Sequence, residues 1–68
     1  MTRIKVNGED AELRAATVAE LLAERGIDPS ARFLAVAVNG TVVRRGEWAG
    51  RALLPGDSVE IVRPMQGG

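Results

Sequence analysis

The sequence predicts an α+β domain in which one helix packs across one face of a mixed β-sheet. Three observations support this fold class: two Asn-Gly pairs that each follow an alternating segment, one amphipathic segment between them, and a last alternating segment near the C-terminus. The 68 residues are 46% hydrophobic and 26% charged, which is typical of one globular domain. We expect that domain to span residues 1–63 and to be followed by a flexible tail over residues 64–68.

The first hairpin is predicted from residues 2–6, in which polar and apolar side chains alternate. This segment runs into Asn7-Gly8, the pair that most readily takes the positive φ angles of a type I′ turn. Residues 11–14 should then pair back antiparallel, with Leu13 pointing into the core. Three acidic side chains beside the turn are interpreted as a solvated strand edge rather than a metal site or a site for a basic partner: Glu9, Asp10 and Glu12.

The only helix is predicted to start at Thr17. Thr17 and Glu20 fit a capping box, in which the Thr17 hydroxyl accepts from the third helical N–H and Glu20 reaches back to the Thr17 N–H. Gly26 supplies the left-handed position that ends the helix, and Pro29 prevents it from resuming. Three apolar residues at the i, i+3, i+4 spacing form the stripe that faces the core: Val18, Leu21 and Leu22.

A second hairpin is predicted around Asn39-Gly40. Residues 34–38 alternate large and small side chains, so that Ala35 and Ala37 lie on the face away from the helix. The turn leads into a fourth strand through residues 42–43. The large residues of the third strand should face the helix: Leu34, Val36 and Val38.

The segment after the second hairpin returns the chain to the sheet. Residues 44–50 are expected to form an irregular or 3₁₀ crossing that lays Trp48 against the core, with Arg44-Arg45 in a solvated loop. The Leu-Pro-Gly-Asp sequence of residues 54–57 is typical of a tight turn. The last strand then covers residues 58–62.

The order of these elements favours a β-grasp arrangement. One helix covers two separate hairpins only if both belong to one sheet, and the last strand joins them if it lies between them, parallel to the first strand. This arrangement also satisfies the right-handed crossover rule. A small open barrel is the alternative.

Composition excludes several classes of function. The chain has neither cysteine nor histidine, which rules out a disulfide framework, a Cys/His zinc site and a Cys-His or Ser-His nucleophile. Nine basic and nine acidic residues balance, whereas a nucleic-acid binder normally has a basic excess. No apolar run has the length of a membrane helix, and residues 1–5 contain no signal-peptide core, so we expect a cytoplasmic protein without nucleic-acid or membrane partners.

Beyond the last strand, the chain continues as Arg-Pro-Met-Gln-Gly-Gly. Pro64 cannot donate to a β-ladder and should end the strand. Gly67 and Gly68 have no side chains with which to pack, so this tail is expected to protrude from the domain and to move.

Over essentially its whole length, the chain resembles the ThiS family of sulfur-carrier proteins, which implies a ubiquitin-like β-grasp fold and a part in thiazole formation for thiamine biosynthesis. The resemblance rests on the order and spacing of its segments: the helix start at 18–22, Ala-Val-Ala-Val-Asn-Gly at 35–40, Val-Val at 42–43, Arg45, Glu47-Trp48, Gly-Asp-Ser-Val-Glu-Ile-Val at 56–62 and Gly-Gly at 67–68.

The resemblance implies a carrier rather than an enzyme. A ThiF-like adenylating enzyme would use MgATP to activate the Gly68 carboxylate, and a persulfide sulfur donor would convert the acyl adenylate into a thiocarboxylate for thiazole synthase (ThiG-like). The rest of the tail, Met65, Gln66 and Gly67, would thread a narrow channel of the partner. The chain itself is expected to bind no cofactor and no metal.

The sheet face opposite the helix is the predicted docking surface for the adenylating enzyme. Ala35, Ala37 and Val62 should form a flat apolar patch there, without a second layer to cover it.

Three other functions remain open. The first is a sulfur carrier of the molybdopterin-synthase type, which would use the same thiocarboxylate with a different acceptor. The second is a ubiquitin-like modifier, whose Gly68 would end in an isopeptide bond. The third is a binding module whose sheet docks a partner without chemistry.

Overall fold

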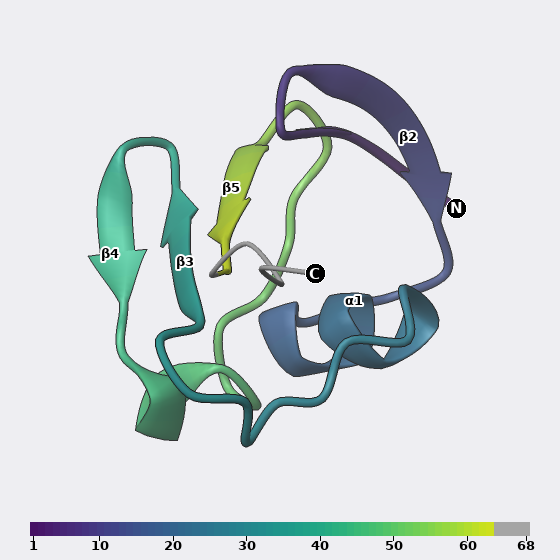
Figure 1. Cartoon of the computed structure of the whole chain (residues 1–68). Helices are drawn as coiled ribbons and strands as arrows, with labels where there is room; N and C mark the ends of the chain where they lie inside the picture. The colour runs from purple at the N-terminus through teal and green to yellow at the C-terminus, as the bar shows by residue number, and fades with distance from the viewer. Residues whose placement is uncertain (64–68) are drawn as a thin grey trace.

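The computed structural model describes residues 1–63 as five strands, one α-helix and one 3₁₀ helix. The predicted flexible tail, residues 64–68, lies outside the described residues. The elements follow in the order β1 (Thr2–Val6), β2 (Glu9–Leu13), α1 (Val18–Glu24), β3 (Ala35–Val38), β4 (Thr41–Val43), η1 (Arg45–Glu47) and β5 (Ser58–Val62) (Figure 1).

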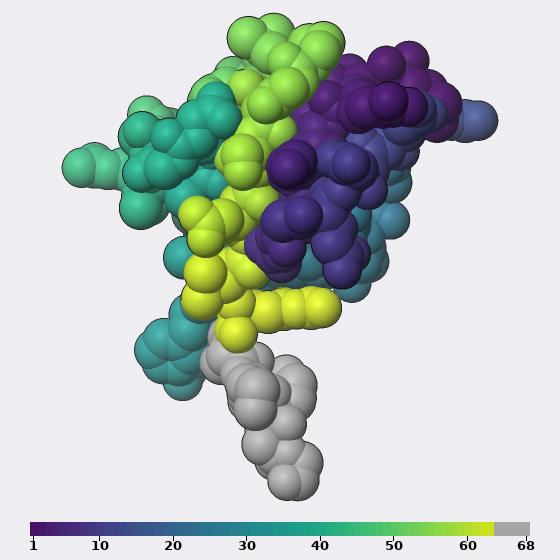
Figure 2. All heavy atoms as spheres, turned by 90° about the horizontal axis from the view of Figure 1, so that it is seen from above, coloured from purple at the N-terminus to yellow at the C-terminus, as the bar shows by residue number. Residues whose placement is uncertain are grey.

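The strands form one mixed sheet in the order β2-β1-β5-β3-β4. β5 pairs in parallel with β1 and antiparallel with β3, so the last strand joins the two hairpins. In Figure 2, β5 (yellow-green) runs between the teal β3–β4 hairpin and the purple β1–β2 hairpin. The predicted mixed sheet with one helix is confirmed, and the small open barrel is not what forms.

Both Asn-Gly pairs form the predicted turns. Asn7 and Gly8 have φ angles of 51° and 83°, and Asn39 and Gly40 have φ angles of 53° and 83°, as a type I′ turn requires. Because only two residues form each turn, Val6 pairs directly with Glu9 and Val38 with Thr41. The second strand therefore begins at Glu9 rather than at the predicted residue 11.

The helix starts at the predicted cap, with one different hydrogen bond. Thr17 Oγ1 accepts from the Glu20 N–H at 3.2 Å, as expected. The Glu20 carboxylate accepts from the Ala16 N–H at 2.9 Å, so its predicted bond to the Thr17 N–H is wrong. Thr17 is extended and forms a β-bridge to Ala52, so the chain enters the helix in a direction that brings the Ala16 N–H within reach of the carboxylate. Gly26 ends the helix with a φ of 71°.

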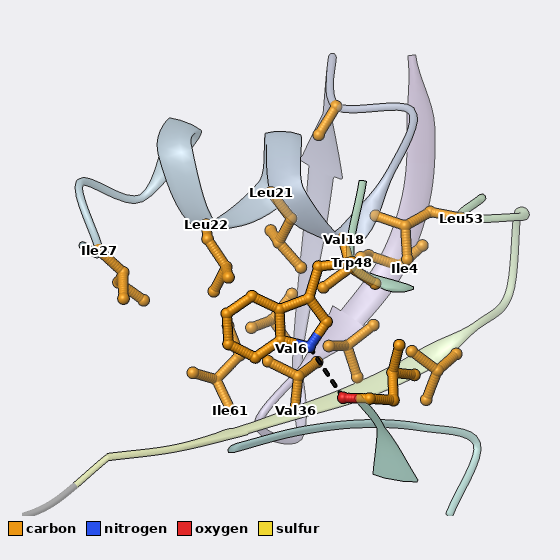
Figure 3. Packing of buried hydrophobic residues seen from close by; sticks show 14 of the residues in the cluster. Ile4, Val6, Val18, Leu21, Leu22, Ile27, Val36, Trp48, Leu53 and Ile61 are labelled. Carbon is orange, nitrogen blue, oxygen red and sulfur yellow. Dashed lines mark hydrogen bonds between the residues drawn. The ribbon is translucent and has the colours of Figure 1, made fainter. Parts of the chain in front are cut away.

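The hydrophobic core lies between α1 and the sheet, and Trp48 fills its centre (Figure 3). The indole is 3% exposed, and its Nε1–H donates to the Val43 carbonyl at 2.8 Å. The expectation that Trp48 anchors the core is confirmed. All the inward-facing residues predicted on strands and helix are buried: Leu13, Val18, Leu21, Leu22, Leu34, Val36 and Val38.

The side chain of Arg45 binds backbone carbonyls of the long connection between α1 and β3. Its guanidinium donates to the carbonyls of Pro29 and Ala31, the latter at 2.8 Å, and lies 4.9 Å from the centroid of the Trp48 ring. The predicted 3₁₀ crossing is present as η1, and Arg45 is exposed there, but its contacts with the two carbonyls and the Trp48 ring were not predicted. Its long side chain reaches two carbonyls that no strand or helix satisfies.

Candidate functional site at the end of the central strand

The candidate site is the place where the chain leaves the sheet. β5 ends at Val62, and Arg63 is the last described residue. Because β5 is the middle strand, the chain leaves from the centre of the sheet rather than from an edge. The predicted reacting residue, Gly68, and the predicted tail residues lie outside the described residues: Met65, Gln66 and Gly67.

The last residues of β5 are held differently on their two sides. On one side, β3 pairs with β5 as far as Val62, which lies opposite Ala35. On the other side, the pairing with β1 ends at Val59, which lies opposite Val6. Beyond that point, the Ile61 N–H donates to the side-chain oxygen Oδ1 of Asn7 at 2.8 Å.

A small hollow of about 150 Å³ lies at the end of β5 where the described chain stops. Arg25 at the end of the helix and Arg63 bring two positive charges to it, and no acidic side chain lines it. The described lining of the hollow therefore carries two positive charges, and Glu9 lies nearby on β2, opposite Val6. The lining residues are Val6, Asn7, Arg25, Ile27, Ile61 and Arg63.

The predicted apolar patch is present on the outer face of the sheet. Ala35 and Val62 are direct cross-strand partners, both are exposed, and Val62 keeps 60% of its surface accessible. Ala37 is half-buried and lies opposite Val42, which is 71% exposed. The patch therefore includes Val42, which the sequence analysis missed.

The other half of the outer face is charged. Arg3 on β1 and Glu12 on β2 form an ion pair with an N–O distance of 2.5 Å, and Lys5 lies opposite Asp10. The hydrogen bond from Arg3, together with its positive charge, lowers the pKa of Glu12. On β3, β4 and β5 the outer face carries one charged residue, the exposed Glu60 opposite Ala37. An apolar surface of a partner therefore buries fewer charges on this half of the face than on the β1–β2 half.

Asp57 is the one buried carboxylate among residues 1–63, and its contacts give it a structural role. Its Oδ1 accepts from the Asn39 side chain at 2.9 Å, and its Oδ2 accepts from the Leu54 N–H at 2.8 Å. Burial raises the pKa of Asp57, but the hydrogen bonds from Leu54 and Asn39 and the charge of Arg51 lower it on balance. Each oxygen accepts a hydrogen bond from within the fold and the side chain is buried, so Asp57 fixes the turn before β5.

The described part of the chain contains no cluster of three or more acidic residues that could hold a metal ion. Neither helix in that part is long and apolar enough to cross a membrane.

Comparison with known proteins identifies the family. The model of the ThiS family matches residues 4–68. The crystal structure of the thiamine biosynthesis protein (ThiS) from Geobacter metallireducens is 30% identical, has a TM-score of 0.78, and aligns with 98% of this chain and 100% of that chain. The NMR solution structure of a thiamine biosynthesis protein from the same organism has the same identity and TM-score, and aligns with 98% of this chain and 88% of that chain.

The comparison with curated proteins finds no match. The family match nevertheless covers both hairpins, the helix and the central strand, and it continues through Gly67 and Gly68. The structural similarity extends over nearly the whole chain at the same time. Sequence and fold therefore agree that this chain belongs to the ThiS family and has its ubiquitin-like β-grasp fold.

Proposed function

We propose that this protein is a sulfur carrier of thiamine biosynthesis that holds sulfur as a thiocarboxylate on Gly68. The observation that carries the proposal is the ThiS family match over residues 4–68, which includes the Gly67-Gly68 pair. Two similar structures are of thiamine biosynthesis proteins, which supports the same pathway. β5, the middle strand of the sheet, is the last element before the described chain ends at Arg63.

The proposed reaction begins with activation of a carboxylate. A carboxylate is a poor acylating group because its charge is delocalised, so one of its oxygens first attacks the α-phosphorus of MgATP on a ThiF-like enzyme and releases pyrophosphate. The terminal sulfur of a persulfide then attacks the acyl carbon, and AMP leaves. A thiol then attacks the donor's sulfur in the resulting acyl disulfide, forms a disulfide with the donor, and releases the thiocarboxylate that donates sulfur to thiazole synthase.

Membership of the ThiS family favours thiazole formation over a molybdopterin-type carrier or a ubiquitin-like modifier. All three share the same adenylated intermediate and differ in the acceptor. Transfer to purified thiazole synthase supports the proposal, and high-molecular-weight conjugates in cells would support the modifier instead.

The carrier chemistry is tested by deleting Gly68. The deletion moves the terminal carboxylate back by about 3.3–3.6 Å, the reach of one residue, whereas misplacement by about 1 Å already costs about a hundredfold in rate. The shortened chain should fold and bind but should not be adenylated. Intact-protein mass spectrometry after incubation with the adenylating enzyme, MgATP and a sulfur donor should show sulfur in place of one oxygen only in the full chain. Equal gain by both chains, or sulfur on an internal residue, contradicts the proposal.

The adenylating enzyme is proposed to dock on the apolar half of the outer face, formed by Ala35, Ala37, Val42 and Val62. Its support is geometric: the four residues are apolar, no described element of the chain covers them, and they include Val62, the last residue before the described chain leaves the sheet. Glu60, opposite Ala37, is the one charged residue that β3, β4 and β5 add to this half of the face.

Ala37→Arg places a charge at the centre of this patch and should weaken binding by about 1 kcal/mol or more, the scale of a central interface residue. Ala23→Arg is the matched control, because Ala23 is exposed on the helix, on the other side of the molecule. Calorimetry should show a loss of affinity for the first variant alone. Equal affinity of both folded variants would exclude this patch.

A further inference from the structure

The side chain of Asn7 extends the pairing of β1 with β5 by one hydrogen bond. The main chains pair only at Lys5 with Ser58 and at Val6 with Val59, because β1 then turns into its hairpin. The Asn7 N–H donates to the Val59 carbonyl at 2.8 Å, and Asn7 Oδ1 accepts from the Ile61 N–H at 2.8 Å. The side-chain oxygen thus takes the place of the carbonyl that a longer β1 would supply.

The second turn contains the same arrangement at the opposite end of β5. Asn39 has nearly the same φ angle as Asn7, and its Oδ1 accepts from the Ser58 N–H at 2.9 Å. Ser58 begins β5, whereas Ile61 precedes its last residue. The two asparagines therefore hold the same strand by the same type of bond, one where the strand starts and one where it ends.

We propose that Asn7 is a positioning residue for the sulfur-carrier reaction, because its bond to Ile61 fixes the direction in which the chain leaves the sheet toward Gly68. This inference rests on the proposed function. On the side of β1, the hydrogen bond from the Ile61 N–H to Asn7 Oδ1 holds β5 beyond Val59. Without this oxygen, the backbone at the end of β5 is hydrogen-bonded through its pairing with β3.

A fixed exit direction affects binding more than chemistry. When the end of β5 adopts several directions, only a fraction of the molecules presents the tail correctly, and the apparent affinity falls by that fraction. Once the tail is bound, its carboxylate is in the same place as before. Loss of the Asn7 bond should therefore raise the KM for the carrier and leave kcat of adenylation nearly unchanged.

The test uses three variants of the full chain and the adenylating enzyme with MgATP. Asn7→Gly keeps the positive φ angle that the turn needs but removes Oδ1. Asn7→Asp keeps an acceptor oxygen and serves as the rescue. Asn39→Gly is the control at the other end of β5, because it removes the same type of bond to Ser58. It also removes the donor to Asp57, so its loss of stability should be at least as large.

Asn7→Gly should raise KM about fivefold to tenfold, the change expected from one ordinary hydrogen bond, with kcat within about twofold. The Ile61 amide should exchange its hydrogen faster by a similar factor. Asn7→Asp should restore KM, and Asn39→Gly should lower stability without raising KM. All rates are compared at a temperature where circular dichroism shows each variant folded.

Three results would overturn the inference: an unchanged KM for Asn7→Gly, an equal rise for Asn39→Gly, or no rescue by Asn7→Asp. Fast exchange of the Ile61 amide in the unaltered protein would also overturn it, and this measurement does not require that any variant folds. Failure of the unaltered chain to be adenylated would instead refute the proposed function itself.

Discussion

Asp57→Asn replaces only one oxygen by an NH₂ group, yet it should lower the free energy of unfolding substantially. Asp57 accepts from two donors, the Leu54 N–H and the Asn39 side chain. Asparagine has one acceptor oxygen, so its amide nitrogen must face one of these donors without a bond. Loss of a hydrogen bond to a buried charged group costs about 1.5–3 kcal/mol.

That cost is large for a domain of this size. A chain of 68 residues is expected to have roughly 3–10 kcal/mol of stability in total, from the usual range per residue. The substitution should lower Tm by about 6–24 °C, given a shift of about 4–8 °C per kcal/mol in small domains. Thermal and urea denaturation at pH 7, followed by the fluorescence of Trp48, measure both quantities.

The effect should depend on pH in a defined direction. The pKa of Asp57 in the folded protein is lower than its ordinary value, so the folded state binds fewer protons than the unfolded state near that pH. The stabilisation is therefore complete above about pH 4, the unfolded value, and is lost as the pH falls through the lower folded pKa. The difference in stability between the parent and Asp57→Asn should shrink as the solution is acidified.

Asp28→Asn provides the control for this experiment. Asp28 also accepts two hydrogen bonds, from the Ser30 N–H and hydroxyl at 2.9 and 2.7 Å, and these bonds lower its pKa. Asp28 is exposed, however, so water can replace either bond, and its substitution should have a much smaller effect. If the two variants are equally stable, or if the Asp57→Asn difference does not change with pH, the assignment of Asp57 as a buried acceptor is refuted.

Three further substitutions test local features of the fold by urea denaturation. Thr17→Ala should cost about 1 kcal/mol, since it removes the side-chain acceptor for the Glu20 N–H; parent-like stability would mean that the cap contributes nothing. Gly26→Ala should cost about 1–2 kcal/mol through its positive φ alone, because an added Cβ meets no atom within 4 Å; a neutral effect would show that the backbone relaxes. Trp48→Phe should cost about 1–3 kcal/mol, because it leaves the Val43 carbonyl without its donor; a smaller loss would indicate that water reaches that oxygen.

Local patterns in the sequence predicted the elements of this fold. The Asn-Gly pairs specify both hairpins because few other dipeptides adopt two consecutive positive φ angles. The position of the last strand between the hairpins followed from the need to cover one sheet with one helix. The same reasoning could have placed Val42 in the apolar patch, since a two-residue turn sets Val42 directly opposite Ala37.

Contacts between distant residues could not be predicted in the same way. The bond from Asn7 to Ile61 spans 54 residues, and the bond from Asn39 to Asp57 spans 18. No local pattern indicates which of many polar side chains will meet after folding. The contacts of Arg45 were missed for this reason, because the carbonyls that it binds belong to a connection whose path is set by the rest of the fold.

Because β5 pairs in parallel with β1 and joins the two hairpins, the sheet cannot form until the last strand has been synthesised. A chain synthesised only as far as residue 57 contains two hairpins that share no strand, and an isolated hairpin is at best marginally stable in water. The decisive contacts join residues near opposite ends of the described chain, which makes loop closure slow and the transition cooperative. A nascent chain that stops within β5 should therefore remain unfolded and open to proteases, rather than persist as a folded domain that lacks its C-terminal residues.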